Sequence, residues 1–129
     1  MIITGLVLTG IAALIHIYIF VLESLAWTGP RAAAIFGLRS AEEAQTTRAL
    51  AFNQGFYNLF LAIAVILGTV LVAAGNTAVG ATLVFVGAGS MVAAGLVLLL
   101  SSPSKAGAAL KQLVPPLLGI AALAVGLAL

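Results

Sequence analysis

Four long apolar stretches, separated by short polar or charged connections, constrain the fold of this chain more than any other feature. As a helix, about 20 mostly apolar residues cross roughly 30 Å of hydrocarbon, and each stretch is that long. The predicted spans cover residues 2–27, 49–74, 78–100 and 106–129. Only 6% of the residues are charged and 64% are hydrophobic, whereas soluble domains carry about 25% charged residues. We therefore predict an all-α membrane protein, a single-domain antiparallel bundle of four transmembrane helices over residues 1–129.

Residues that end or begin helices mark the connections. Thr28-Gly29-Pro30 ends the first span, because proline lacks an amide donor and disfavours helix just before it. Ser40 is a good N-cap and Glu43 is the matching capping-box acid, so we predict a short cytoplasmic surface helix between spans one and two. Gly75-Asn76-Thr77 and Ser101–Lys105 form the other connections. No Lys or Arg precedes the first apolar run, so we expect a retained span rather than a cleaved signal peptide.

The basic residues are distributed very unevenly. All five lie in or beside the first and third connections: Arg31, Arg39, Arg48, Lys105 and Lys111. Since positive residues beside spans favour the cytoplasmic side, we predict that connections 28–48 and 101–105 are cytoplasmic and that both termini lie outside. So few and scattered basic residues do not make a nucleic-acid surface. The absence of cysteine excludes disulfides and thiolate chemistry.

Spans one and two carry nearly all the polar side chains expected within the membrane: His16, Tyr18, Glu23, Asn53, Gln54, Tyr57 and Asn58. His16 and Glu23 are seven residues apart, so they share a helix face about 10 Å apart along the axis. Counting inward from the cytoplasmic interface places Glu23 level with Asn53 and Gln54, and His16 level with Asn58. An ionised carboxylate facing lipid costs at least about 2.5 kcal/mol. These side chains should therefore face the bundle interior or a hydrated cavity.

This polar group has two interpretations. In the first, Glu23 and His16 exchange protons or hold a ligand in a hydrated, cytoplasm-facing cavity that Asn53, Gln54, Tyr57 and Asn58 help to line. In the second, the polar side chains only join helices, at about 0.6 kcal/mol per hydrogen bond, and Glu23 forms a salt bridge to Arg31 or Arg48. A zinc site requires three or four clustered ligands, so no metal is expected, and no cofactor motif is present.

Two runs of the sequence, HIYIFVLESLAWTGPRAAAIFGL and NQGFYNLFLA, resemble a family of small bacterial inner-membrane proteins catalogued as domain of unknown function 1304. The shared motif comprises His16, Glu23–Trp27, Phe36-Gly37-Leu38 and Asn53–Asn58. The resemblance is clear over the first half of the chain and extends to length and span layout in the remainder. It implies a four-span protein of the bacterial inner (plasma) membrane and implies no activity. Gly55 within the motif is small enough for the polar side chains to approach span one closely.

These observations lead us to expect a small multi-pass protein, surrounded by membrane lipids, that binds or transports a small solute through a polar cavity on helices one and two. Four spans enclose little volume, so we expect a homo-oligomer, a dimer or higher. The alternative is a non-transporting accessory or scaffold subunit with a membrane-protein partner. An enzyme acting on lipids is less favoured, and no catalytic residue is assigned. A general base must reach its proton at about 3 Å or through one water, and His16 and Glu23 are too far apart to cooperate.

Overall fold

The computed structural model describes residues 1–129 and contains only helices and their connections. The elements in chain order are α1 (Ile2–Phe20), the π-helical turn η1 (Val21–Leu25), α2 (Pro30–Phe36), α3 (Ala41–Ala73), α4 (Thr77–Ser101), the 3-10 turn η2 (Pro103–Lys105) and α5 (Ala106–Ala128). Four segments are long and apolar enough to cross a membrane: Ile2–Leu25, Ala41–Ala73, Thr77–Ser101 and Pro103–Ala128. The predicted bundle of four transmembrane helices is confirmed.

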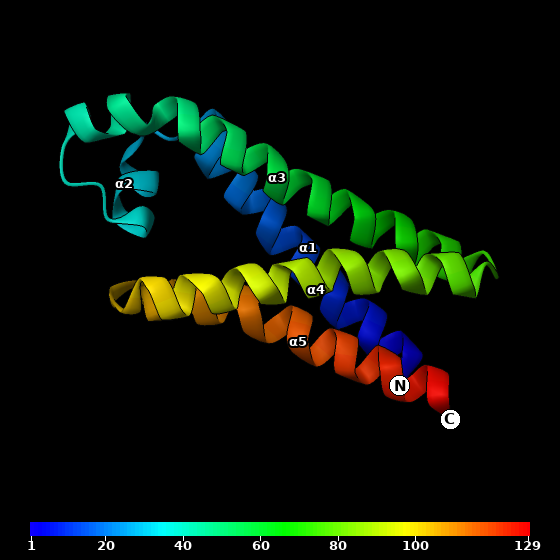
Figure 1. Cartoon of the computed structure of the whole chain (residues 1–129). Helices are drawn as coiled ribbons and strands as arrows, with labels where there is room; N and C mark the ends of the chain where they lie inside the picture. Colours follow the sequence, from blue (N-terminus) through cyan, green and yellow to red (C-terminus); the bar gives the residue numbers. More distant parts are fainter.

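The four long helices surround a common interior in the order α1, α3, α4, α5 (Figure 1). α1 packs against α3 and α5, and α4 packs against the same two helices, so α1 and α4 lie diagonally across the bundle. Both termini lie at one end, and α2 lies at the other (Figure 1). All five basic residues belong to the end that carries α2, which we call the charged end. The uneven charge seen in the sequence therefore becomes a difference between the two ends of the bundle.

Small side chains fill the middle of the bundle. A buried cluster consists of Ala12, Ala13, Ala62, Val65, Ala88 and Met91. Between α3 and α4 the backbones meet directly, because a Cβ on Gly68 would lie 2.6 Å from the carbonyl oxygen of Gly80. Such small-residue contacts are typical of helix packing in membranes, where close packing rather than a hydrophobic driving force holds helices together.

Large apolar side chains cover the outside of the bundle. Ile3, Val97 and Leu100 are 78%, 66% and 79% exposed. Continuous apolar surface of this kind is rare on soluble monomers, and a bilayer would cover it. The four apolar spans and this outer surface identify a multi-pass membrane protein.

The connection between α1 and α3 contains the predicted short helix, and it lies earlier than the Ser40 signal suggested. α2 begins with Pro30 in its first turn, where the missing amide hydrogen costs nothing. It ends at Gly37, whose φ of 70° is the left-handed conformation that glycine adopts most readily. The predicted turn between α3 and α4 likewise contains Gly75 with φ of 88°.

The predicted helix start at Ser40 is confirmed. Ser40 Oγ accepts a hydrogen bond from the Glu43 amide at 3.1 Å, and Glu43 Oε2 accepts one from the Arg39 amide at 2.7 Å. This start belongs to α3 itself, so the prediction of a separate helix there was wrong, and span two begins at Ala41 rather than at residue 49. With 33 residues, α3 is about 50 Å long and exceeds the hydrocarbon thickness, so its polar first turns extend into the interface.

Candidate functional site

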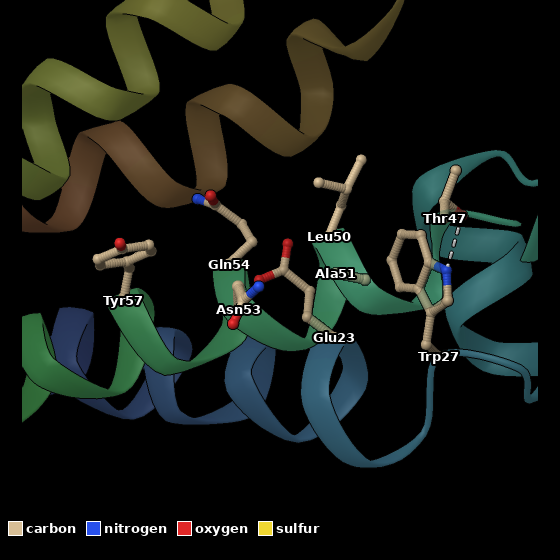
Figure 2. A pocket seen from close by; sticks show the side chains of 8 residues that line it. All are labelled: Glu23, Trp27, Thr47, Leu50, Ala51, Asn53, Gln54 and Tyr57. Carbon is tan, nitrogen blue, oxygen red and sulfur yellow. Dashed lines mark hydrogen bonds between the residues drawn. The ribbon is translucent and has the colours of Figure 1, made fainter.

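Glu23 lies in the middle of η1, the π-helical last turn of the first span. The turn is closed by the Ala26 amide, which donates to the Val21 carbonyl at 2.9 Å across five residues. A π-helical turn inserts one extra residue into a helix and is frequently found at functional sites. Just beyond it, Trp27 Nε1 donates a hydrogen bond to Thr47 Oγ1 at 3.0 Å and joins the end of the first span to α3 (Figure 2).

The π-helical turn approaches α3 very closely at Gly55. A Cβ at this position would lie 3.1 Å from the Glu23 Cβ and 3.0 Å from the Ser24 amide nitrogen, and still closer to Ser24 Oγ. The Ser24 hydroxyl donates to the Phe52 carbonyl at 2.8 Å, which fixes the two segments together. Gly55 therefore allows the close approach that the sequence motif suggested.

Glu23 and Asn58 form the one buried side-chain pair that joins the two segments. Both residues are nearly buried, at 8% and 9% exposed, and Asn58 Nδ2 donates to Glu23 Oε2 at 2.8 Å. The same Nδ2 donates to the Gln54 carbonyl at 3.1 Å. The predicted pairing of Asn58 with His16 was therefore wrong. Helical side chains lean toward the N-terminus of their helix. Because the first span and α3 are antiparallel, the Glu23 side chain leans away from the charged end and the Asn58 side chain leans toward it, so the two side chains meet.

Two hollows adjoin Glu23. The Trp27 groove is open, has a volume of about 710 Å³, and is lined by Glu23, Trp27, Thr47, Leu50, Ala51, Asn53, Gln54 and Tyr57 (Figure 2). The Glu23 cavity is more enclosed, has a volume of about 310 Å³, and is lined by Ile19, Glu23, Ile35, Phe36, Gln54, Asn58, Ala94, Leu98, Lys105, Ala108 and Gln112. Glu23 and Gln54 line both hollows, so these two side chains stand between the groove and the cavity.

The structure brings five of the six predicted site residues to these hollows and leaves one apart. Glu23, Gln54 and Asn58 line the cavity, whereas Asn53 and Tyr57 line the groove only. His16 lines neither hollow. It is 1% exposed, and its Nδ1 pairs with the Ala12 carbonyl of its own helix at 2.9 Å.

Lys105 and Gln112 also line the Glu23 cavity, from η2 and α5, and they were not among the site residues predicted from the sequence. They are seven residues apart, as are His16 and Glu23. α1 and α5 run antiparallel, with Gly5 against Leu123 and Gly119 against Thr9. This packing brings the first turns of α5 beside the end of the first span. Lys105 stood out in the sequence only as part of the charge asymmetry, and Gln112 is a single amide in an apolar span, so no sequence signal joined them to Glu23.

No cation neutralises Glu23 directly. No Lys or Arg nitrogen lies within 4.0 Å of its carboxylate, so the salt bridge to Arg31 or Arg48 is not formed. Arg31 instead donates from Nη1 to the Tyr18 hydroxyl at 3.2 Å. The only basic residue that lines the Glu23 cavity is Lys105. The cavity thus presents an acid and a base that do not contact one another.

Four apolar spans, a charged end and a nearly buried carboxylate define the class as a small multi-pass membrane protein with a polar interior at one end. The family described as "Protein of unknown function (DUF1304)" matches residues 10–124. The chain belongs to this family, as its motifs predicted, and the matched region includes every residue that lines the two hollows. Comparison with curated proteins and with solved structures gives no match.

Proposed function

We propose that the protein binds a small polar solute in the Glu23 cavity and transports it by way of the Trp27 groove, with Glu23 as the proton- or cation-binding group. The position of Glu23 carries the proposal, because it is nearly buried and shared by both hollows. A carboxylate can accept about four hydrogen bonds, and Asn58 supplies a single one. Glutamine at this position would join the helices without the cost of burying a charge, so helix joining alone does not explain a carboxylate.

The walls of the cavity indicate the chemistry of the solute. Glu23 would accept hydrogen bonds from a cationic or proton-donating group, while Lys105 and the Gln112 amide, which line the same cavity, would donate to an acceptor group of the solute. Gln54 and Asn58 add two amides to the lining. A solute that fits 310 Å³ and carries both kinds of group would satisfy all of these side chains.

The direct test compares Glu23→Gln with the matched control Glu42→Gln, which changes an exposed carboxylate in the first turn of α3. A ligand at a hundredfold excess over its dissociation constant stabilises the native state by about 2.7 kcal/mol. Thermal unfolding of purified protein would therefore be screened against small amines, amino acids and polyols. We expect the stabilising solutes to act on wild type and Glu42→Gln and not on Glu23→Gln, and the same solutes to cross proteoliposomes. A Glu23→Gln protein that binds and transports like wild type would refute the proposal.

Hydration of the cavity can be tested separately, because the natural chain has no cysteine. A cysteine at Asn58 or Gln112 should react with a membrane-impermeant maleimide applied from the charged side. A cysteine at Ala13 or Ala88, both 0% exposed in the core, should not. If the cavity cysteines are as protected as the core cysteines, the site is dry and does not admit a polar solute.

The topology and assembly of the protein belong to the same proposal. We place it in the bacterial inner membrane as a homo-oligomer, a dimer or higher, with residues 28–48 and 101–105 cytoplasmic and both termini outside. The charge asymmetry between the two ends supports this orientation. A cysteine at Ser104 should be labelled only from the cytoplasmic side, and labelling from outside would reverse the assignment.

The scaffold function remains a defined alternative, favoured by the hydrogen bonds that tie the end of the first span to α3. Ser24, Trp27 and Asn58 each take part in one such bond. An accessory subunit would keep its assembly after Glu23→Gln, and affinity purification would recover one stoichiometric membrane-protein partner. That result, together with a dry cavity, would replace the transport proposal.

A further inference from the structure

A third hollow, separate from the Glu23 cavity, lies between α1 and α5 near the charged end. Its volume is about 590 Å³, and it is lined by Ile15, Tyr18, Leu110, Lys111, Val114 and Pro115. We call it the Tyr18 groove. It is open, and Tyr18, Leu110 and Val114 are 41%, 45% and 42% exposed. In a bilayer, this groove faces the surrounding lipid.

Two basic residues lie at or beside this groove: Lys111 lines it, and Arg31 contacts Tyr18, which also lines it. Arg31 follows the end of the first span and reaches back to donate from Nη1 to the Tyr18 hydroxyl at 3.2 Å. Lys111 lies within α5, about 8 Å inward from Ala106, and its long side chain can extend toward the interface. Neither side chain forms an ion pair with a carboxylate. The surface of the groove itself is apolar, and the two basic residues supply positive charge beside it.

We propose that the Tyr18 groove binds one anionic phospholipid. The lipid phosphate would lie between Arg31 and Lys111, and an acyl chain would lie against Ile15, Val114 and Pro115. A guanidinium matches the geometry of phosphate oxygens and can bind two of them. The Tyr18 hydroxyl, while accepting from Arg31, still has its own proton to donate to a phosphate oxygen.

Charge and shape together favour this occupant. Basic pockets between transmembrane helices on the cytoplasmic side bind anionic headgroups, and all the basic residues of this chain lie at that end. A free phosphate ion would leave the apolar part of the groove uncovered. An uncharged lipid would leave the two cations without a counter-ion.

The test measures which lipids remain bound when the protein is released from nanodiscs of equimolar phosphatidylglycerol and phosphatidylcholine into a native mass spectrometer. Each basic residue near a membrane surface contributes about 1 kcal/mol to binding of anionic lipid, so two residues favour phosphatidylglycerol by about thirtyfold. We expect wild type to retain phosphatidylglycerol at least about tenfold over phosphatidylcholine. Arg31→Gln with Lys111→Gln should bring this ratio close to one.

Matched variants separate a defined site from general surface charge. Arg39→Gln with Arg48→Gln removes the same charge at the same end and should keep the preference. Val114→Phe fills the groove and should lower lipid retention, whereas Val97→Phe on the exposed face of α4 should not. The proposal is overturned if wild type shows no preference, if the Arg39/Arg48 pair matters equally, or if Val114→Phe retains the lipid. Displacement of the lipid by inorganic phosphate would also overturn it, in favour of a free-anion site.

Discussion

Replacement of Gly55 by alanine tests whether close approach of α3 to the π-helical turn supports the site. The new methyl group would meet the Ser24 amide nitrogen at 3.0 Å and the Glu23 Cβ at 3.1 Å, besides the Ser24 hydroxyl. The hydroxyl can rotate away only by losing its bond to the Phe52 carbonyl. The backbone nitrogen and the Glu23 Cβ cannot rotate away, so α1 and α3 must separate by a few tenths of an ångström.

The expected change in the free energy of unfolding follows from three contributions. Overpacking costs about 1 to 3 kcal/mol, and the lost Ser24 hydrogen bond about 0.6 kcal/mol. Alanine is favoured over glycine in a helix by about 1 kcal/mol. Gly89→Ala is the matched control, because position 89 lies within α4 and has nothing within 4 Å of a new Cβ. The helix preference cancels between the two variants, so Gly55→Ala should be less stable than Gly89→Ala by about 2 to 4 kcal/mol.

The assay is equilibrium unfolding in mixed micelles followed by fluorescence of Trp27, the single tryptophan of the chain. The Trp27 indole donates a hydrogen bond to Thr47 of α3. Its emission therefore reports separation of α3 from the end of the first span, the two segments that meet at Gly55. Gly89→Ala should unfold at a denaturant concentration equal to or above that of wild type. If Gly55→Ala is as stable as Gly89→Ala, the approach at Gly55 is not the tight contact described above.

Two further substitutions test the helix start and the core. Ser40→Ala removes the acceptor for the Glu43 amide and should cost about 1 kcal/mol, with faster amide hydrogen exchange at the start of α3. Ser104→Ala, at a serine that makes no side-chain hydrogen bond, is its control. Met91→Ala should cost about 2 to 5 kcal/mol, because Met91 is 0% exposed within the central cluster. Val97→Ala, on the exposed face of α4, should unfold close to wild type.

The sequence predicted the spans well because their lengths and apolar content are set by the bilayer rather than by tertiary detail. The start of α3 could not be placed in this way. The segment from Ala41 to Arg48 is polar. Apolar content therefore places the start of the second span after this segment, although the helix itself already begins at Ala41. The Ser40 cap correctly predicted where a helix begins. The sequence did not show that this helix continues without a break into the second span. A cap marks where a helix begins and carries no information on how far it extends.

The candidate site was only partly predictable, for reasons of geometry. The sequence predicted different depths in the membrane for Glu23 and Asn58. Those depths describe Cα positions, whereas the two side chains lean in opposite directions along the bundle and so reach the same level. The π-helical turn at Val21–Leu25 has no recognisable sequence signal in this chain and becomes visible only in the backbone hydrogen bonds. Gln112 is the only amide side chain within the last two spans, and nothing in the sequence connects it with Glu23.

The packing of α3 against α4 explains why four short helices leave room for a polar cavity. Close backbone contacts between them occur at Gly68 with Gly80, near the connecting turn, and at Gly87 with the Leu61 carbonyl. Toward the charged end the two helices diverge (Figure 1), and Ala94 and Leu98 of α4 line the cavity there.

The first span does not follow this divergence, because Gly55 holds its π-helical turn against α3. The cavity therefore lies among the first span, α3, α4 and α5, and Ile35 and Phe36 of α2 also line it. The volume available to a solute then depends on the separation of α3 from α4, while the orientation of the Glu23 carboxylate depends on the contact at Gly55. Because different helix pairs control these two properties, bulk added at Ala94 should exclude a solute and leave the Glu23–Asn58 hydrogen bond intact.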